Sequence, residues 1–320
     1  IWSAGDGSNK RALSRFVSGG TGQASEDISL SVRTGGSWYE LNVNVSFRDP
    51  SAWYHFVWVW DSDNGTAADR MRIYVNGERL TSFSNTPSYP ASGTATDSWN
   101  NSSYAHQIGF ENNTRFFDGY LAEMYHIDGQ ALTPASFGET DSNTGQWVPI
   151  DASDLTFGTR GWYLKGEDSS DLGNDSSGNG NDFTSSGLAA ADQLTDSPTN
   201  NFCTWNPIEP TSTSNMSLQD GNLIANGFDS AQRGTIFVSS GKWYAELTIS
   251  AAMSAYFGIS EDTANMDGFP SLDNLDGYLY YSFNGQKINQ AGSGSSYGSS
   301  WNTAGKTVGV AVDMDNGAIW

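Results

Sequence analysis

The sequence contains one cysteine, Cys203, so it can form no internal disulfide, and it has no Cys/His pattern of a metal-binding motif. It has only 15 Lys and Arg residues against 36 Asp and Glu, which gives a formal net charge of −21. Nucleic acids and anionic membranes are bound mainly through Lys and Arg, so this charge argues against both partners. No run of 18 apolar residues is present, which argues against membrane insertion.

Catalytic motifs are also missing. The sequence has no G-x-S-x-G, H-E-x-x-H or P-loop pattern, and none of the E-x-D-x-x-E spacing that paired-carboxylate hydrolases carry on one strand. Glu123 stands alone in a predicted strand, where we expect a solvent-facing carboxylate. The three histidines, His55, His106 and His126, each lie in strand-like sequence and are expected to be packed or solvated. The sequence therefore predicts a protein that is not an enzyme.

What the chain does contain is aromatic residues (13%) and glycine (36 of 320 residues), a composition typical of strands and turns. The clearest stretch is residues 51–83. Residues 53–60 are almost all aromatic or β-branched, as in a strand packed on both faces. Residues 70–75 alternate with period 2, Asn76-Gly77 predicts a tight hairpin, and a third strand is expected over residues 79–83. This antiparallel meander predicts an all-β fold.

Further short strands are expected at regular spacing on both sides of the meander, which is typical of a sandwich or jelly roll. They cover residues 13–17, 28–33, 38–45, 106–110 and 117–127. Leu132 to Gly138 is expected to form the only helical turn, with Thr133 as its N-cap and Pro134 in the first position.

Three phrases then follow one another in order: WYHFVWVWD (53–61), RMRIYVNGE (70–78) and FFDGYLAEMYHIDGQALTPASFGE (116–139). Together they resemble the laminin-G-like jelly roll of the concanavalin-A-like group. The likeness is closest to the version in virion proteins of marine tailed phages, in which the third phrase is a recurrent closing sequence. The resemblance covers residues 1–150 and implies a lectin-like β-sandwich.

Residues 151–210 are expected to form an extended connector rich in Pro, Thr, Ser and Asn. Within it, residues 161–184 include one strand-like segment. This part either completes the first sandwich or remains a connector, and the sequence leaves both alternatives open.

The last part of the chain contains GKWYAELTI (241–249) and VGVAVDMDNGAIW (308–320), which resemble two strands of a SPRY domain in the same order. The alternation along residues 243–249 predicts a sheet with one packed face. The predicted fold is therefore two consecutive concanavalin-A-like antiparallel β-sandwiches. The second, over residues 211–320, is expected to be truncated at its C-terminus, because the family's last strands are missing; the chain also begins in what reads as mid-strand.

Asp175, Ser177 and Asn179 place oxygen ligands at positions 1, 3 and 5 of a loop with Gly180 at position 6, as calcium loops do. The closing glutamate at position 12 is replaced by Ser186. The alternative is a turn whose Asp and Asn side chains bond to its own backbone. A second acidic cluster, Asp61, Asp63 and Asp69, is expected to be a solvated hairpin loop.

Exposed aromatic rings on loops of a rigid sandwich are the usual platform for sugars. The candidate glycan-binding residues are Tyr89, Trp99, Tyr104, Tyr297 and Trp301, with Tyr278 and Tyr280 as further possibilities. The competing interpretation is that these rings belong to the core, as most Trp and Tyr in a sandwich do.

The resemblance implies a non-enzymatic protein of the virion surface, and hence an extracellular location, that adheres to host or environmental glycans. It also implies contacts with other virion proteins and a homo-oligomer in which avidity multiplies weak sugar affinities. Two alternatives remain: a purely structural virion scaffold, and an accessory carbohydrate-binding module of a secreted polysaccharide hydrolase.

Overall fold

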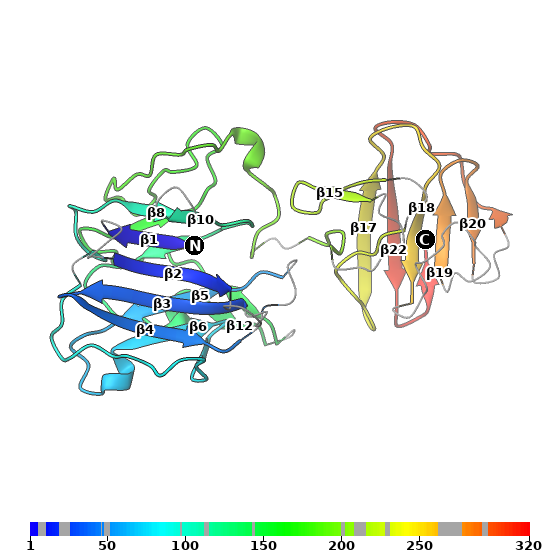
Figure 1. Cartoon of the computed structure of the whole chain (residues 1–320). Coiled ribbons are helices and arrows are strands. Elements are labelled where there is room, and N and C mark those ends of the chain that lie inside the picture. Colours follow the sequence, from blue (N-terminus) through cyan, green and yellow to red (C-terminus); the bar gives the residue numbers. More distant parts are fainter. Residues whose placement is uncertain are drawn as a thin grey trace. The chain divides into compact units, whose positions relative to one another are not determined.

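The computed structural model describes residues 1–5, 11–18, 26–45, 47, 52–96, 98–111, 115–142, 145–199, 202–207, 216–227, 231–261, 277–289 and 294–320. The chain divides into two compact units, Ile1–Asn201 and Phe202–Trp320, which are described separately (Figure 1). Both consist of antiparallel strands, as predicted, and the described residues form no α-helix. No helix in these ranges has the length and apolarity needed to cross a bilayer.

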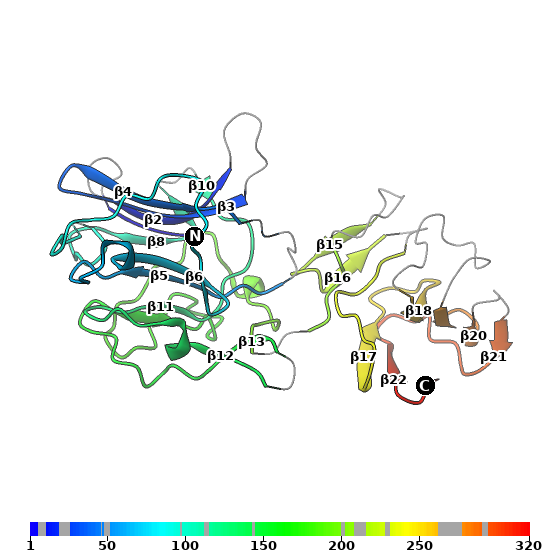
Figure 2. The same cartoon turned by 90° about the horizontal axis from the view of Figure 1, so that it is seen from below.

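The largest sheet of the first unit has five antiparallel strands in the order β4-β3-β2-β1-β8. Its strands are β1 (Trp2–Gly5), β2 (Arg11–Ser18), β3 (Glu26–Thr34), β4 (Ser37–Val43) and β8 (His106–Ile108). Figure 2 shows this sheet as one layer, with β5 and β6 lying beneath it.

The second layer is the predicted meander, with strands β5 (Phe56–Trp60), β6 (Met71–Val75) and β7 (Glu78–Arg79). Val75 pairs with Glu78 across the turn, and both turn residues have positive φ, 48° at Asn76 and 84° at Gly77. The Asn-Gly hairpin is therefore confirmed. Its positive φ values are those that Asn and Gly adopt at least cost.

The core of the first unit lies between these two layers. Residues from alternate positions of β3 meet the buried face of β6, because side chains of a strand point to opposite faces in turn. Fully burying such a side chain stabilises the fold by roughly 1.5–3 kcal/mol. The buried set is Ala12, Ile28, Leu30, Val32, Leu41, Val43, Met71 and Ile73.

The strand expected over residues 79–83 ends earlier than predicted. The strand after the hairpin ends at Arg79, and Phe83 forms a bridge with Val43 of β4. Phe83 packs against the core from this position, so the chain leaves the meander to join the other layer.

The prediction of a single strand over residues 117–127 is wrong. The chain forms β9 (Phe110–Glu111) with β10 (Arg115–Phe116), and resumes as β11 (Met124–His126). Between β10 and β11, Gly119 has φ of 151° and Glu123 has φ of 51°. These values interrupt extended backbone, and the second is uncommon for a residue with a side chain.

Residues after 136 add strands to the first unit. β14 (Trp162–Leu164) pairs with β11, and Leu164 forms a further bridge with Asp175. Separately, β12 (Gly138–Thr140) pairs with β13 (Trp147–Pro149). The stretch around 161–184 thus hydrogen-bonds to the first unit.

Trp147 holds the β12–β13 pair against the hairpin turn. Its ring lies so close to Gly77 and Gly138 that an added Cβ would come within 2.5 Å and 2.7 Å of ring atoms. Its indole Nε1 donates a hydrogen bond of 3.0 Å to His55 Nδ1. Two glycines are therefore needed for one indole to pack.

Within the described residues, helical structure is limited to three short 3₁₀ segments: η1 (Ala67–Asp69), η2 (Pro134–Ser136) and η3 (Ala190–Asp192). η2 lies where the helical turn was predicted, with Pro134 in its first turn. The expectation that it is the only such turn is wrong. Thr133 has the extended backbone of an N-cap, but its side chain makes no capping hydrogen bond.

The second unit contains a hairpin and two further sheets. The hairpin joins β15 (Ser217–Gln219) to β16 (Ile224–Asn226). One sheet has the order β17-β22-β23, with β17 (Lys242–Thr248), β22 (Thr307–Asp313) and β23 (Ala318–Ile319). The other has the order β18-β19-β20-β21, with β18 (Tyr256–Ser260), β19 (Gly277–Tyr281), β20 (Gln286–Ile288) and β21 (Gly294–Ser296).

The packed face predicted for residues 243–249 is only partly formed by β17. Trp243 lies opposite Val312, and Ala245 lies opposite Val310. Val310, Val312 and Ile249 are buried, but Trp243 is 48% exposed. Burial on this face is therefore concentrated on β22 and at the end of β17.

A chain of aromatic contacts, two edge-to-face and one stacked, links β1, β8, β11 and β14 in the first unit. Ring centroids are 5.4 Å apart for Trp2 and His106, 5.3 Å for His106 and His126, and 5.7 Å for His126 and Trp162. Burial lowers the pKa of His126 to about 3, helped by the neighbouring His106. Burial also lowers the pKa of His55 to about 4.

Acid should therefore destabilise the first unit. The unfolded chain takes up a proton at each histidine near pH 6.5, whereas folded His126 and His55 stay neutral to about pH 3 and about pH 4. Between these values each histidine should lower the free energy of unfolding by up to about 1.4 kcal/mol per pH unit of acidification. Urea titrations at a series of pH values from neutral to about pH 4.5 measure this slope. Hydrogen exchange of the backbone amides in β11 and β14 follows the same loss of stability locally. His126→Gln and His55→Gln should each make it shallower; slopes equal to that of the unchanged protein would contradict the assignment.

Candidate functional site

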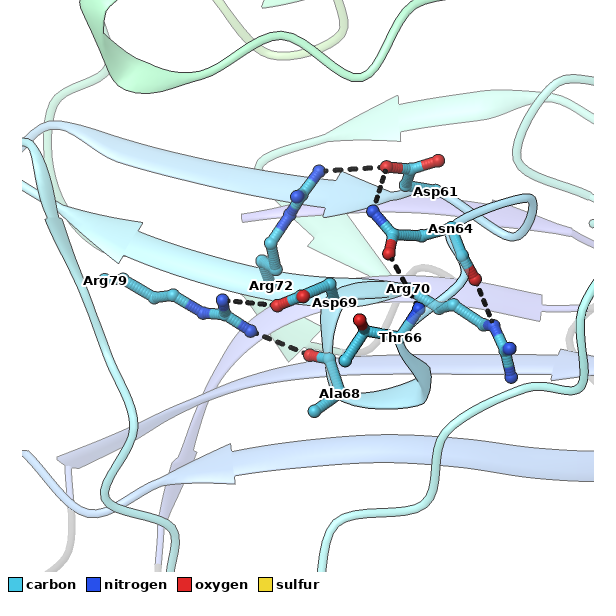
Figure 3. A network of polar contacts seen from close by, with 8 residues as sticks. All are labelled: Asp61, Asn64, Thr66, Ala68, Asp69, Arg70, Arg72 and Arg79. Atoms are coloured by element: carbon cyan, nitrogen blue, oxygen red, sulfur yellow. Dashed lines mark hydrogen bonds and ion pairs between the residues drawn. The ribbon is translucent and has the colours of Figure 1, made fainter.

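The acidic loop between β5 and β6 is closed by arginines, as Figure 3 shows. Arg72 pairs with Asp61 at 3.3 Å, and Arg79 pairs with Asp69 at 2.5 Å. Asn64 also donates to Asp61 at 3.1 Å. Asp61 and Asp69 are thus part of a network that fixes the loop, whereas Asp63 is exposed.

Asp175, at the first position of the candidate calcium loop, is buried and accepts four hydrogen bonds from the chain. Oδ1 accepts from the backbone N–H of Tyr163 and Ser177, at 2.8 Å and 2.9 Å. Oδ2 accepts from the Ser177 hydroxyl and the Asn181 N–H, at 2.8 Å and 2.9 Å. A carboxylate has about four acceptor positions, so protein donors already use those of Asp175.

The rest of this loop also bonds to its own unit. The Asn179 side-chain amide donates to the carbonyls of Gly158 and Gly161, at 2.7 Å and 2.8 Å. Burial alone would raise the pKa of Asp175, but the hydrogen bonds outweigh it and lower the pKa below its ordinary value. Within the described ranges, no three His, Cys, Asp or Glu side chains are grouped to hold a metal. Asp175, Ser177 and Asn179 are thus held by hydrogen bonds within the loop and to residues 158–163, and calcium binding by these residues stays a prediction.

Glu123 is not the solvent-facing strand carboxylate that the sequence predicts. It is half-buried, and its Oε2 accepts hydrogen bonds from the hydroxyls of Tyr125, at 2.8 Å, and of Tyr163. Burial and the Glu123 carboxylate raise the pKa of both tyrosines, so the phenols remain donors. A retaining or inverting glycosidase needs a second carboxyl group facing the first. The groups that contact the Glu123 carboxylate here are two phenols.

The aromatic candidates of the first unit are half-buried and not exposed. Tyr89 and Trp99 pack against the core, and the Trp99 ring centroid lies 5.2 Å from that of Trp2. Tyr104 is half-buried. The more exposed rings of this unit are Phe116 at 74% and Tyr120 at 51%, which sequence reasoning missed.

In the second unit, the structure brings together most of the aromatic candidates. Tyr278 and Tyr280 lie two residues apart on β19 and therefore share one face of the β18–β21 sheet. The Tyr280 ring contacts Tyr297 edge-on, with centroids 5.4 Å apart, and lies 5.7 Å from Trp301. Tyr278 and Tyr297 are 48% and 52% exposed, whereas Trp301 is only 6% exposed.

We call Tyr278, Tyr280, Tyr297 and Lys287 the tyrosine face. Trp301 lies buried beside it and contributes packing, since it offers no exposed ring. Lys287 is directly opposite Tyr280 in the β19–β20 pair, and its Nζ lies 5.5 Å from the centroid of the Tyr297 ring. At this distance an ammonium and an aromatic ring attract each other. Sequence reasoning missed Lys287, because its place beside the rings depends on strand register.

Backbone hydrogen bonds hold this face in position. The Tyr280 hydroxyl donates to the Ser299 carbonyl at 2.7 Å. Gly298 allows this contact, because a Cβ there would lie 2.3 Å from the Tyr280 oxygen. The Trp301 N–H donates to the Ser282 carbonyl at 2.9 Å, which ties the segment carrying Tyr297 to the end of β19. The rings are therefore fixed before any ligand arrives.

Comparison with known proteins gives one family. Residues 2–136 match the model of the concanavalin A-like lectin/glucanases superfamily. The matched segment includes both layers of the first unit and ends within η2. No curated protein and no solved structure matches the chain significantly. Residues 2–136 are thus similar to concanavalin A-like domains, a class whose description includes both lectins and glucanases.

Asp175→Asn should weaken the first unit by about 1–3 kcal/mol, because an amide cannot accept all four hydrogen bonds and leaves buried donors unpaired. Asp171→Asn is a matched control, since Asp171 lies nearby and is exposed. Urea unfolding of both variants, with and without millimolar calcium, measures the effect. We expect calcium to leave the stability of the unchanged protein unaltered; a rise in melting temperature with calcium would instead show that the loop binds the ion.

Proposed function

We propose that this protein binds glycans without catalysis, through the tyrosine face of its second unit. The observation that carries the proposal is the pair of half-exposed rings, Tyr278 and Tyr297, near the ring of Tyr280, which is anchored by its hydroxyl. Tyr278 shares its strand face with Tyr280, and Tyr297 contacts the Tyr280 ring edge-on. Sugar rings dock on such fixed aromatic surfaces through their C–H faces, and fixed rings lose little entropy when the ligand binds.

The first unit supports the same function at a coarser level. Its concanavalin A-like fold is shared by lectins and glucanases, and fold alone does not select between them. The Glu123 carboxylate accepts hydrogen bonds from two tyrosine hydroxyls. This arrangement favours binding over hydrolysis.

We further infer the biological setting from the phrases in the sequence. The segment over residues 116–139 resembles the closing sequence of tailed-phage virion proteins, and adhesion at a virion surface is the setting we propose. The second unit is inferred to be SPRY-like: the two phrases that carry this resemblance lie in β17 and β22, which pair in antiparallel register. Homo-oligomers and neighbouring virion subunits would supply the avidity that single weak sites need.

The test begins with a glycan array probed with the protein immobilised at high density, so that weak sites act together. Tyr297→Ala and Tyr278→Ala should each weaken binding of the selected glycan roughly two- to tenfold, the value of one aromatic contact. Because both side chains are half-exposed, the melting temperature should change little.

Tyr120→Ala is the matched control, because Tyr120 is as exposed as Tyr297 but lies in the first unit. It should bind as the unchanged protein does. Loss of binding in this variant alone would move the site to the first unit. Absence of binding to every glycan at high valency would favour a structural scaffold instead.

A further inference from the structure

The charge of the second unit is unevenly distributed along its sequence. Residues 277–312 contain no Asp or Glu, the longest such stretch in a chain that has 36 of these residues. The same stretch contains Lys287 and Lys306. It forms β19, β20 and β21 and nearly all of β22, and β18 also lacks a carboxylate. The sheet that carries the tyrosine face is therefore locally basic in an acidic protein.

Lys287 differs from the basic residues described elsewhere. Lys165 and Lys242 lie 3.9 Å and 3.5 Å from the carboxylates of Glu167 and Asp313. Arg72 likewise pairs with an aspartate. Lys287 lies over the Tyr297 ring, as Lys165 lies over that of Tyr163, but the four strands of its sheet carry no acidic residue. An ammonium held over a ring keeps its charge available to an anion that arrives at the same surface.

We propose that the tyrosine face takes an acidic glycan, a pyranose chain whose carboxylate or sulfate groups pair with Lys287 while a sugar ring stacks on Tyr297. This inference rests on the proposed function and adds the class of glycan. The net charge of −21 does not oppose it at physiological salt. Charges farther away than about 8 Å are largely screened there, whereas an ion pair at contact is screened less.

Binding to three ligands of similar length tests the proposal: an oligogalacturonate, a sulfated oligogalactan and a neutral oligogalactan. We expect both acidic ligands, or one of them, to bind more tightly than the neutral one, and the comparison identifies the preferred anion. Lys287→Met should weaken acidic-ligand binding about two- to tenfold and leave neutral-ligand binding unchanged. Lys287→Glu should weaken it further, and Lys287→Arg should restore it.

Lys306→Met is the matched control, because Lys306 is an exposed lysine of the same acid-free stretch. It should leave all three affinities unchanged, and circular dichroism checks the fold of every variant. Equal affinity for neutral and acidic ligands, or equal losses in Lys287→Met and Lys306→Met, overturns the acidic preference while the glycan site stands. Failure of Tyr297→Ala to alter binding of any ligand overturns the glycan site itself.

Discussion

Burial of one face of β3 against one face of β6 is the interaction on which the first unit depends. Ile28, Leu30 and Val32 occupy alternate positions of β3, and Met71 and Ile73 do the same on β6. A shift of either strand by one residue would turn these side chains outward, so the register of both sheets follows from this contact. The half-buried rings of Tyr89 and Trp99 pack against the same core, so part of each ring is covered by it.

Among the described residues, the second unit buries fewer apolar side chains than the first, and several of its aromatic rings are exposed. Among the residues of this unit that the structure describes, the buried apolar side chains are Ile249, Ile288, Trp301, Val310 and Val312. Several other large side chains of this unit are exposed, among them Tyr278 on β19 and Tyr297 just after β21. Aromatic residues thus occur in this unit both in the core, as Trp301 does, and at the surface, where the proposed glycan site uses them.

Local sequence patterns predict the elements of this fold better than they predict exposure. The Asn76-Gly77 turn and the alternation in β3 follow from φ preferences and period 2, which act over a few residues. The break at Glu123 does not follow from local patterns, because its carboxylate bonds to the hydroxyl of Tyr163, a residue distant in the sequence, while its backbone has a positive φ. Tyr297 and Trp301 were equivalent candidates in sequence, since only tertiary packing buries one and exposes the other. The position of Lys287 beside the rings follows from its pairing with Tyr280 between β19 and β20, which the sequence alone does not predict.

The packing of Trp147 has a practical consequence for anyone dividing this chain into pieces. The family match ends at residue 136, yet the indole that covers Gly77 and bonds to His55 comes after that point. The strand that pairs with β11 comes later still. A recombinant fragment cut at the family boundary would expose a hairpin backbone and an unpaired strand edge, which invites aggregation. The smallest piece worth expressing therefore extends past β14 and the Asp175 loop.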